Sequence, residues 1–144
     1  MVFATRLPPE EHLARLRLAD LFLDTFNVNA HTTASDALWA GLPVVTKLGK
    51  GFAARVGGSL LNAVGLPELI TENDADYEAL IFDLAKAPRK LSEYKKRLNA
   101  NRTTKPLFDT RGYTKDLETG YQLAYQKYFE GAPSETIIVP QKSE

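Results

Sequence analysis

The sequence contains no cysteine, only two histidines and no net charge. The lack of cysteine excludes disulfides, thiolate metal sites and cysteine nucleophiles, and it is typical of a reducing compartment, so we expect a cytoplasmic protein. Two histidines are too few to build a transition-metal site by themselves, and no metal is expected. Lysine and arginine together number 18, as do aspartate and glutamate, and no basic block occurs, which argues against a nucleic-acid partner.

Long hydrophobic runs are also missing. No apolar stretch approaches the ~20 residues that cross a bilayer, and the N-terminus lacks the long apolar region of a secretory signal, so no membrane partner is expected. The remaining composition, 44% hydrophobic and 25% charged residues over 144 positions, is typical of one globular domain. The first residues have the composition of a strand cut at its upstream edge, so we expect the chain to begin inside a longer polypeptide.

Strand and helix patterns alternate along the chain. Short apolar runs predict strands at 2–4, 21–25, 43–46 and 68–71. Start signals, stop signals and periodicity predict helices at 10–19, 31–40, 52–64, 73–87, 90–102 and 111–129. Gly57 and Gly58 weaken the third of these helices. This order predicts an α/β protein with a Rossmann-like parallel sheet flanked by helices, followed by a C-terminal helical extension.

The strongest local signal for a ligand is the run Asn-Ala-His-Thr-Thr-Ala-Ser-Asp at 29–36, between a predicted strand and a helix. Ligands of parallel sheets bind outside the carboxyl ends of the strands. The first turn of a helix offers backbone N–H groups and a partial positive charge, which together hold a phosphate. His31 and the hydroxyls of Thr32, Thr33 and Ser35 would add donors to such a site.

The same run has a second interpretation as a helix cap. Thr33 and Asp36 have capping-box spacing, in which the threonine caps the helix and the acid lies at its third position. The pattern alone favours the cap, although a capped helix start still offers other amides to a ligand. Both interpretations stay open on the sequence.

Two further pairs of side chains lie near predicted strand ends. His12 and Arg15 are three residues apart on one helix, where an imidazole and a guanidinium can bind a base or a phosphate. Alternatively, Arg15 pairs with Glu11 and His12 is a surface residue. Lys47 and Lys50 could meet a phosphate, but a solvated turn is the favoured interpretation.

The remaining candidates are structural. Tyr113, Tyr121 and Tyr128 recur at roughly helical spacing and are expected to pack rather than to stack on a ligand. Arg55 is expected to form a surface or interdomain ion pair. No serine lies in a nucleophile-elbow context and no pair of carboxylates stands out, so no catalytic constellation is predicted.

Several blocks resemble the C-terminal catalytic lobe of the protein O-GlcNAc transferases, a family that includes the SPINDLY-like proteins. These blocks are RLPPEEHLAR at 6–15, LADLFLDT at 18–25, HTTASDALWAGLPVVT at 31–46, FAARV at 52–56 and PLFDT at 106–110. They occur in the family's order, and the resemblance extends over almost the whole chain to about Tyr128.

The resemblance implies the C-terminal half of a GT-B glycosyltransferase, in which two Rossmann-like lobes face a cleft and the second lobe binds the nucleotide sugar. Such enzymes invert the anomeric centre without a metal or another cofactor. They move a sugar to serine or threonine of proteins. The resemblance makes GlcNAc, from UDP-GlcNAc, the first candidate for that sugar. Residues 1–130 would form the nucleotide-sugar-binding lobe, including the terminal helices, and 131–144 a tail.

The family's motifs imply a nucleotide- and diphosphate-binding set of seven residues: Leu7, His12, Arg15, His31, Thr32, Thr33 and Asp36. The histidine and threonines at the second helix would meet the diphosphate, the aspartate the ribose, and the first three residues the nucleotide, chiefly its base. The family's catalytic lysine and acceptor-side histidine would lie upstream of Met1. We therefore expect no catalytic residue in this chain and no transfer activity from it alone.

Pro9 departs from the family pattern, which often has a lysine beside the nucleotide at this position. SPINDLY-like relatives can use a GDP-fucose donor, so the donor sugar stays open. The implied partners are the nucleotide-sugar donor, an acceptor protein, the N-terminal GT-B lobe and helical repeats, and an exposed interdomain surface would favour self-association. The alternatives are a non-catalytic α/β module that binds a nucleotide diphosphate or a protein, and a response-regulator-like domain, which the lack of an acidic cluster after the first strand disfavours.

Overall fold

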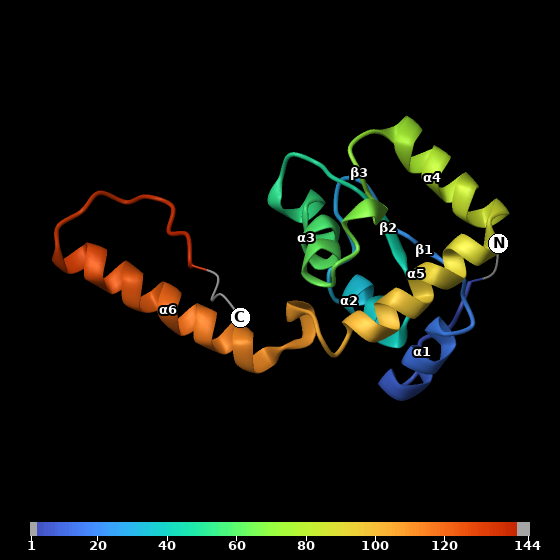
Figure 1. The fold of residues 1–144 in the computed structure, drawn as a ribbon, viewed down its shortest axis with the longest axis horizontal. Helices are drawn as coiled ribbons and strands as arrows, with labels where there is room; N and C mark the ends of the chain where they lie inside the picture. Colours follow the sequence, from blue (N-terminus) through green and yellow to red (C-terminus); the bar gives the residue numbers. More distant parts are fainter. Residues whose placement is uncertain (1–2, 141–144) are drawn as a thin grey trace. The chain divides into compact units, whose positions relative to one another are not determined.

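The computed structural model describes residues 3–140. The chain divides into two compact units, Met1–Leu107 and Phe108–Glu144. The larger unit holds the sheet and the first five α-helices, and the smaller unit is built around one long helix (Figure 1).

The sheet of the larger unit has three parallel strands in the order β1-β2-β3. These strands are β1 (Phe22–Leu23), β2 (Val44–Lys47) and β3 (Ile70–Thr71). Three of the four predicted strands are confirmed: β1 and β3 are shorter than predicted, and β2 begins and ends one residue later than predicted. The strand predicted at 2–4 is wrong for Phe3 and Ala4, which are irregular, and Val2 lies outside the described residues. A short apolar run becomes a strand only where a neighbour supplies hydrogen-bond partners, and no described strand lies beyond β1 to supply them.

Helices and 3₁₀ turns connect and cover the strands. In chain order they are α1 (Pro9–Leu16), α2 (Thr32–Ala40), η1 (Phe52–Ala54), α3 (Val56–Ala63), η2 (Pro67–Leu69), α4 (Asp74–Lys86) and α5 (Pro88–Asn101). The predicted order is confirmed. Helix α1 stops before the predicted end at 19, where Leu18 is exposed and no packing supports another turn. Helix α2 ends at Gly41, whose left-handed φ of 88° suits glycine.

The core of the larger unit forms around β2. Val44 and Val45 are 1% and 0% exposed, because helices cover both faces of the central strand. Gly57 and Gly58 lie inside α3, despite their low helix propensity, because α3 approaches β2 very closely. A Cβ atom at Gly57 would lie 2.5 Å from Asp24 Oδ2. Glycine therefore lowers the helix propensity at these two positions but allows α3 to pack closely against its neighbours.

Strand β1 forms one edge of the sheet. The amide of Phe22 donates to the carbonyl of Pro43, directly before β2, and that of Asp24 to the carbonyl of Val45, so the amide and carbonyl of Leu23 point to the opposite side. The Leu23 side chain is 53% exposed and lines an apolar groove with Leu21 and Ile81. The outer backbone of β1 is therefore accessible in the larger unit.

The smaller unit contains α6 (Thr110–Phe129), which the short turn η3 (Pro106–Phe108) precedes. Asp109 caps α6 by accepting a hydrogen bond from the amide of Gly112, at 3.0 Å. The predicted tyrosines of this helix stay largely exposed: Tyr113, Tyr121 and Tyr128 are 67%, 62% and 76% exposed, although the Tyr128 ring stands edge-on to Phe129 with centroids 5.6 Å apart. Among the described residues the expectation that they pack thus holds only for this Tyr128 contact, since helical spacing defines a common face but not a partner for it.

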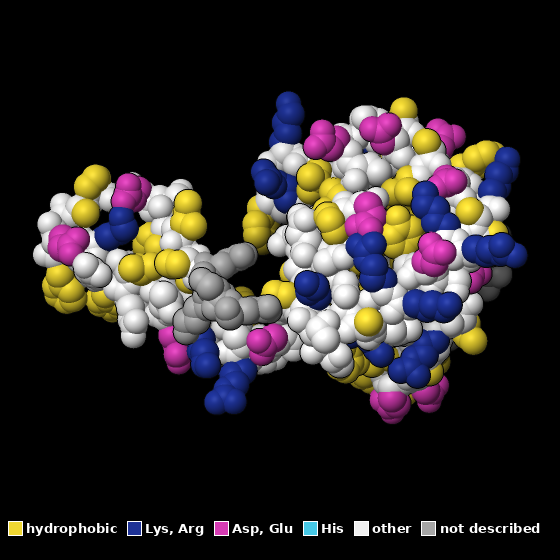
Figure 2. Space-filling view, in the orientation of Figure 1, with side chains coloured by type: hydrophobic (Ala, Val, Ile, Leu, Met, Phe, Trp, Pro, Cys, Tyr) yellow, Lys and Arg dark blue, Asp and Glu magenta, His cyan; other side chains and the backbone are white. Residues whose placement is uncertain are grey.

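Charged side chains of both signs are interspersed over the larger unit on the face seen in Figure 2. This distribution agrees with the equal numbers of acidic and basic residues. Among residues 3–140, no helix combines the length and the hydropathy needed to cross a bilayer.

Candidate functional site

The start of α2 is the centre of the candidate site. The helix begins at Thr32, so its N-cap residue is His31, and the His31 side chain makes no capping hydrogen bond. The predicted capping box is therefore wrong, because Thr33 is already the second helical residue and Asp36 the fifth. The carbonyl of His31 accepts the first helical hydrogen bond, from the amide of Ser35 at 3.0 Å. The first turn keeps its N–H groups and its positive dipole end without a side-chain cap.

Three of the side chains around this turn, His31, Thr32 and Thr33, can donate hydrogen bonds to an anion. His31, Thr32 and Thr33 are exposed, and Asp36 is half-buried in the next turn. The His31 ring stands edge-on to Phe52, with centroids 6.2 Å apart, and its Nε2 lies 3.4 Å from a backbone carbonyl of η1. Because a carbonyl only accepts, Nε2 is the donor in this contact, and the contact is long for a hydrogen bond, so the same N–H can turn to a ligand. The structure thus brings together all four residues predicted here.

Helix α1 carries the second group of predicted residues and packs against α2. One guanidinium nitrogen of Arg15 lies 3.0 Å from His12 Nδ1, and the other donates to the carbonyl of Thr5 at 2.9 Å. Among the described residues these contacts replace the alternative pair with Glu11. Because arginine is only a donor, His12 Nδ1 accepts and its Nε2–H is left to donate. Leu7 is half-buried in the segment that leads into α1.

The lysines after β2 behave differently from each other. Lys47 forms an ion pair with Asp74, and its Nζ lies 4.1 Å from the centre of the Phe26 ring. Its charge is therefore compensated within the chain, whereas Lys50 is exposed as a solvated turn predicts. Arg55 is exposed and lines a shallow pocket beside η1. Across residues 3–140, no group of three or more histidine, aspartate or glutamate side chains is arranged to hold a metal ion.

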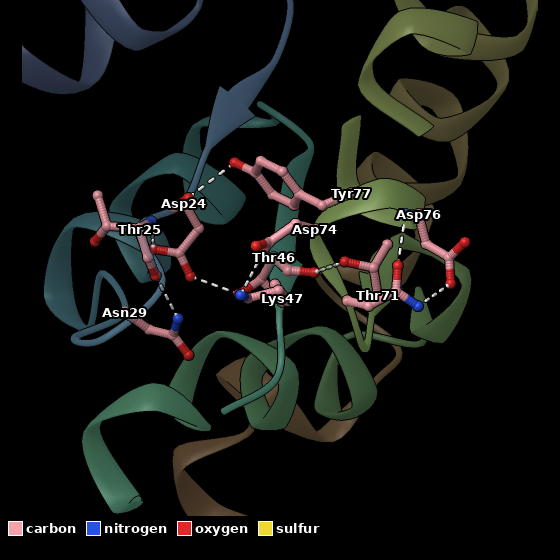
Figure 3. Close-up of polar contacts among 10 residues, drawn as sticks. Asp24, Thr25, Asn29, Thr46, Lys47, Thr71, Asp74, Asp76 and Tyr77 are labelled. Atoms are coloured by element: carbon pink, nitrogen blue, oxygen red, sulfur yellow. Dashed lines mark hydrogen bonds and ion pairs between the residues drawn. The ribbon is translucent and has the colours of Figure 1, made fainter. Parts of the chain in front are cut away.

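A buried polar network under this site was missed by the sequence reasoning (Figure 3). Asp24 directly follows β1 and is only 4% exposed. Its Oδ1 accepts from the amides of Thr25 and Ala30 at 2.8 and 2.7 Å, and its Oδ2 accepts from Thr46 Oγ1 at 2.6 Å. The Tyr77 hydroxyl donates to the Asp24 carbonyl at 2.8 Å. Burial, and secondarily the Asp24 charge, raises the pKa of the Tyr77 hydroxyl.

Asn29 ties the same loop to the next part of the chain. This residue is 3% exposed, and its side chain donates to the carbonyl of Thr25 at 2.7 Å. Its Oδ1 accepts from the amide of Gly57 at 3.2 Å, and its own amide donates to the carbonyl of Ala53 at 2.8 Å. The one signal in the sequence was the placement of Asp24 directly after an apolar strand, where parallel sheets form their sites.

Comparison with known proteins defines the class to which this α/β unit belongs. An O-GlcNAc transferase mutant from Thermobaculum terrenum has a similar structure, with a TM-score of 0.82 and 29% identity over 87% of this chain and 24% of that chain. This likeness confirms the predicted fold class, a Rossmann-like parallel sheet of the C-terminal half of a GT-B glycosyltransferase. The family model named Glycosyl transferase family 41 matches residues 1–117. The chain belongs to glycosyltransferase family 41.

Curated relatives carry matching names. The chain is 42% identical over 122 residues to a probable UDP-N-acetylglucosamine–peptide N-acetylglucosaminyltransferase SEC of Arabidopsis thaliana, covering 84% of this chain and 12% of that protein. It is 35% identical over 137 residues to the UDP-N-acetylglucosamine–peptide N-acetylglucosaminyltransferase of Caenorhabditis elegans, covering 95% and 12%. A probable enzyme of the same activity name, SPINDLY of Hordeum vulgare, is 35% identical over 121 residues. The chain thus spans about 12% of the length of the first two relatives.

Proposed function

We propose that this chain is the donor-binding lobe of an inverting glycosyltransferase. The enzyme moves a sugar, for which GlcNAc is the favoured candidate, from a nucleotide diphosphate to serine or threonine of proteins. The lobe comprises residues 1–130 and the tail 131–144. Membership of family 41 and the names of the relatives support the reaction class. The observation that carries the proposal is the start of α2, where one exposed imidazole and two exposed hydroxyls surround a helix turn without a side-chain cap.

In this proposal the diphosphate binds at the first turn of α2. Thr32 and Thr33 donate their amides and hydroxyls to phosphate oxygens, and His31 donates from its ring. When the acceptor hydroxyl attacks the anomeric carbon, the bond from that carbon to the diphosphate breaks and negative charge grows on the leaving phosphate. Donors fixed in advance at that position stabilise the growing charge without reorganisation.

The remaining predicted residues would hold the nucleoside. Asp36 accepts hydrogen bonds from the ribose hydroxyls, since a carboxylate is only an acceptor. His12, Arg15 and the backbone of Leu7 contact the base from α1 and the segment before it. Transfer requires groups outside this chain, namely the other GT-B lobe, helical repeats and an acceptor protein. The isolated chain is therefore expected to bind the donor without transferring its sugar.

Calorimetric titration of the 144-residue chain with UDP, GDP and UDP-GlcNAc tests the proposal. We expect UDP to bind, and we expect His31→Ala and Thr33→Val each to weaken it about tenfold, the effect of losing one hydrogen bond to a charged group worth about 1.5 kcal/mol. Thr114→Val, which alters an exposed threonine of α6, is the matched control and should bind UDP as the wild type does. Unchanged affinity in both site variants would refute the assignment, and GDP binding in preference to UDP would redirect the donor toward a GDP-sugar.

A further inference from the structure

We propose that Asp24 is a positioning residue for the diphosphate site. Its buried carboxylate closes the loop between β1 and α2 and thereby sets where His31 and the first turn of α2 lie. The inference rests on the proposed function and deepens it, because it names the group that pre-organises the donors rather than another donor.

The first step is the closure of the loop by a single oxygen atom. Asp24 Oδ1 accepts from the amide of Thr25 at 2.8 Å and from the amide of Ala30 at 2.7 Å. These two amides lie at the first and last positions of the six-residue segment 25–30, and His31 follows directly. The position of one carboxylate oxygen therefore determines where the chain arrives at the N-cap of α2.

The second step connects this loop to the most buried strand of the sheet. Asp24 Oδ2 accepts from the hydroxyl of Thr46, a residue of β2 that is 0% exposed. The Tyr77 hydroxyl holds the Asp24 main chain from the side of α4. Because β2 is covered on both faces, Thr46 has a fixed position. Its hydrogen bond therefore fixes the Asp24 carboxylate, and the carboxylate in turn fixes the loop. Figure 3 shows the contacts of Asp24 with Thr46 and Tyr77.

The third step links the same loop to η1, against which the His31 ring is oriented. Asn29 donates its amide to the carbonyl of Ala53, the carbonyl that His31 Nε2 approaches at 3.4 Å. The Asn29 side chain also accepts from the amide of Gly57 at the start of α3. Asp24 thus fixes the loop that precedes His31, and Asn29 fixes that loop against η1 and the start of α3.

The charge of Asp24 points to the same role. Its hydrogen-bond partners among the described residues are two amides and one hydroxyl, all neutral. A buried carboxylate is costly to desolvate, and its charge opposes a neighbouring phosphate. What the carboxylate gains over a neutral side chain is shorter and stronger hydrogen bonds to the loop amides. Its contribution to an anion site therefore comes through geometry and not through attraction.

Asp24→Asn in the 144-residue chain tests the inference. Asparagine keeps one oxygen for the loop amides and presents an NH₂ group to the Thr46 hydroxyl, which can accept, so the variant is expected to fold. We expect UDP affinity to fall about tenfold in calorimetry. Thr71→Val is the matched control, because it removes a different buried hydroxyl, which donates to the Thr46 carbonyl, without touching the loop. This control should keep wild-type affinity.

The double variant with His31→Ala distinguishes positioning from a general loss of stability. If Asp24 acts by placing His31 and its turn, the two losses of UDP affinity overlap, so the double variant should bind clearly more tightly than the product of the single losses predicts. A multiplicative loss, or Asp24→Asn binding as tightly as Thr71→Val, overturns the inference while leaving the proposed function intact. Absence of UDP binding in the wild type overturns both. If Asp24→Asn fails to fold, Thr46→Val takes its place with the same expected overlap.

Discussion

Substitution of Gly57 by alanine is expected to destabilise the larger unit severely for a single methyl group. The added Cβ would lie 2.5 Å from Asp24 Oδ2, 2.6 Å from Thr46 Oγ1 and 3.1 Å from Thr46 Cβ. Contacts below 3 Å force atoms apart, and these neighbours are buried on a central strand and in a loop fixed by hydrogen bonds. Neither side can move without separating the Thr46 hydroxyl from the Asp24 carboxylate.

The expected magnitude follows from three effects. Overpacking of a core site costs about 1–3 kcal/mol. Weakening a buried hydrogen bond to a carboxylate costs about 1–3 kcal/mol more. Replacing a helical glycine by alanine returns about 0.5–1 kcal/mol. The free energy of unfolding should therefore fall by about 3 kcal/mol, a large part of the roughly 5–15 kcal/mol typical of a domain.

Urea unfolding followed by circular dichroism measures this difference. Gly51→Ala is the matched control, since a Cβ at Gly51 would have no neighbour within 4 Å and the residue has an extended backbone conformation. We expect Gly51→Ala to stay within about 1 kcal/mol of the wild type. Equal stability of the two variants would refute the reasoning, because it would mean that α3 does not approach Asp24 and Thr46 as described.

Two further predictions concern pH. Tyr77→Phe removes a hydroxyl whose pKa is raised by burial and then by the Asp24 charge, so the stability that the hydroxyl contributes is present below about pH 10 and is lost as pH rises through the raised pKa. The stability gap between wild type and variant should narrow above pH 10 in urea unfolding, and a constant gap would contradict this. Glu68→Gln removes a carboxyl whose pKa is lowered by its hydrogen bond with Arg97. Its contribution is present above the ordinary value of 4.5 and is lost as pH falls. Because the pair is partly exposed, the variant should lose less than about 1 kcal/mol at neutral pH and nothing under strong acid, and a gap that widened in acid would contradict the sign.

The order of strands and helices could be predicted because local signals set it. Gly41 ends α2 as predicted, α5 begins at Pro88, two residues before its predicted start, and the apolar run at 43–46 overlaps the central strand at 44–47. The N-cap of α2 could not be predicted, because Thr33 has the better capping pattern. The choice of His31 depends on where the preceding loop is closed, which is decided by the carboxylate of Asp24.

The buried residues that position the candidate site could not be predicted either, because their contacts join residues far apart in the sequence. Asp24 meets Thr46 across 22 residues and Tyr77 across 53. No periodicity or local motif marks such pairs, since each residue taken alone is compatible with a strand end, a strand or a helix. The exposed groups at the α2 start, by contrast, form one contiguous run and could be found from the sequence.

The accessible outer backbone of β1 has a practical consequence for every stability measurement on this chain. A strand edge with an outward-pointing amide and carbonyl at Leu23, whose side chain is itself exposed, is a template on which other chains can add strands. Heating unfolds part of the protein and exposes its apolar segments, so aggregation competes with refolding. The measured melting temperature then depends on the scan rate and on the protein concentration. Denaturant titration of dilute protein keeps the transition a property of single molecules.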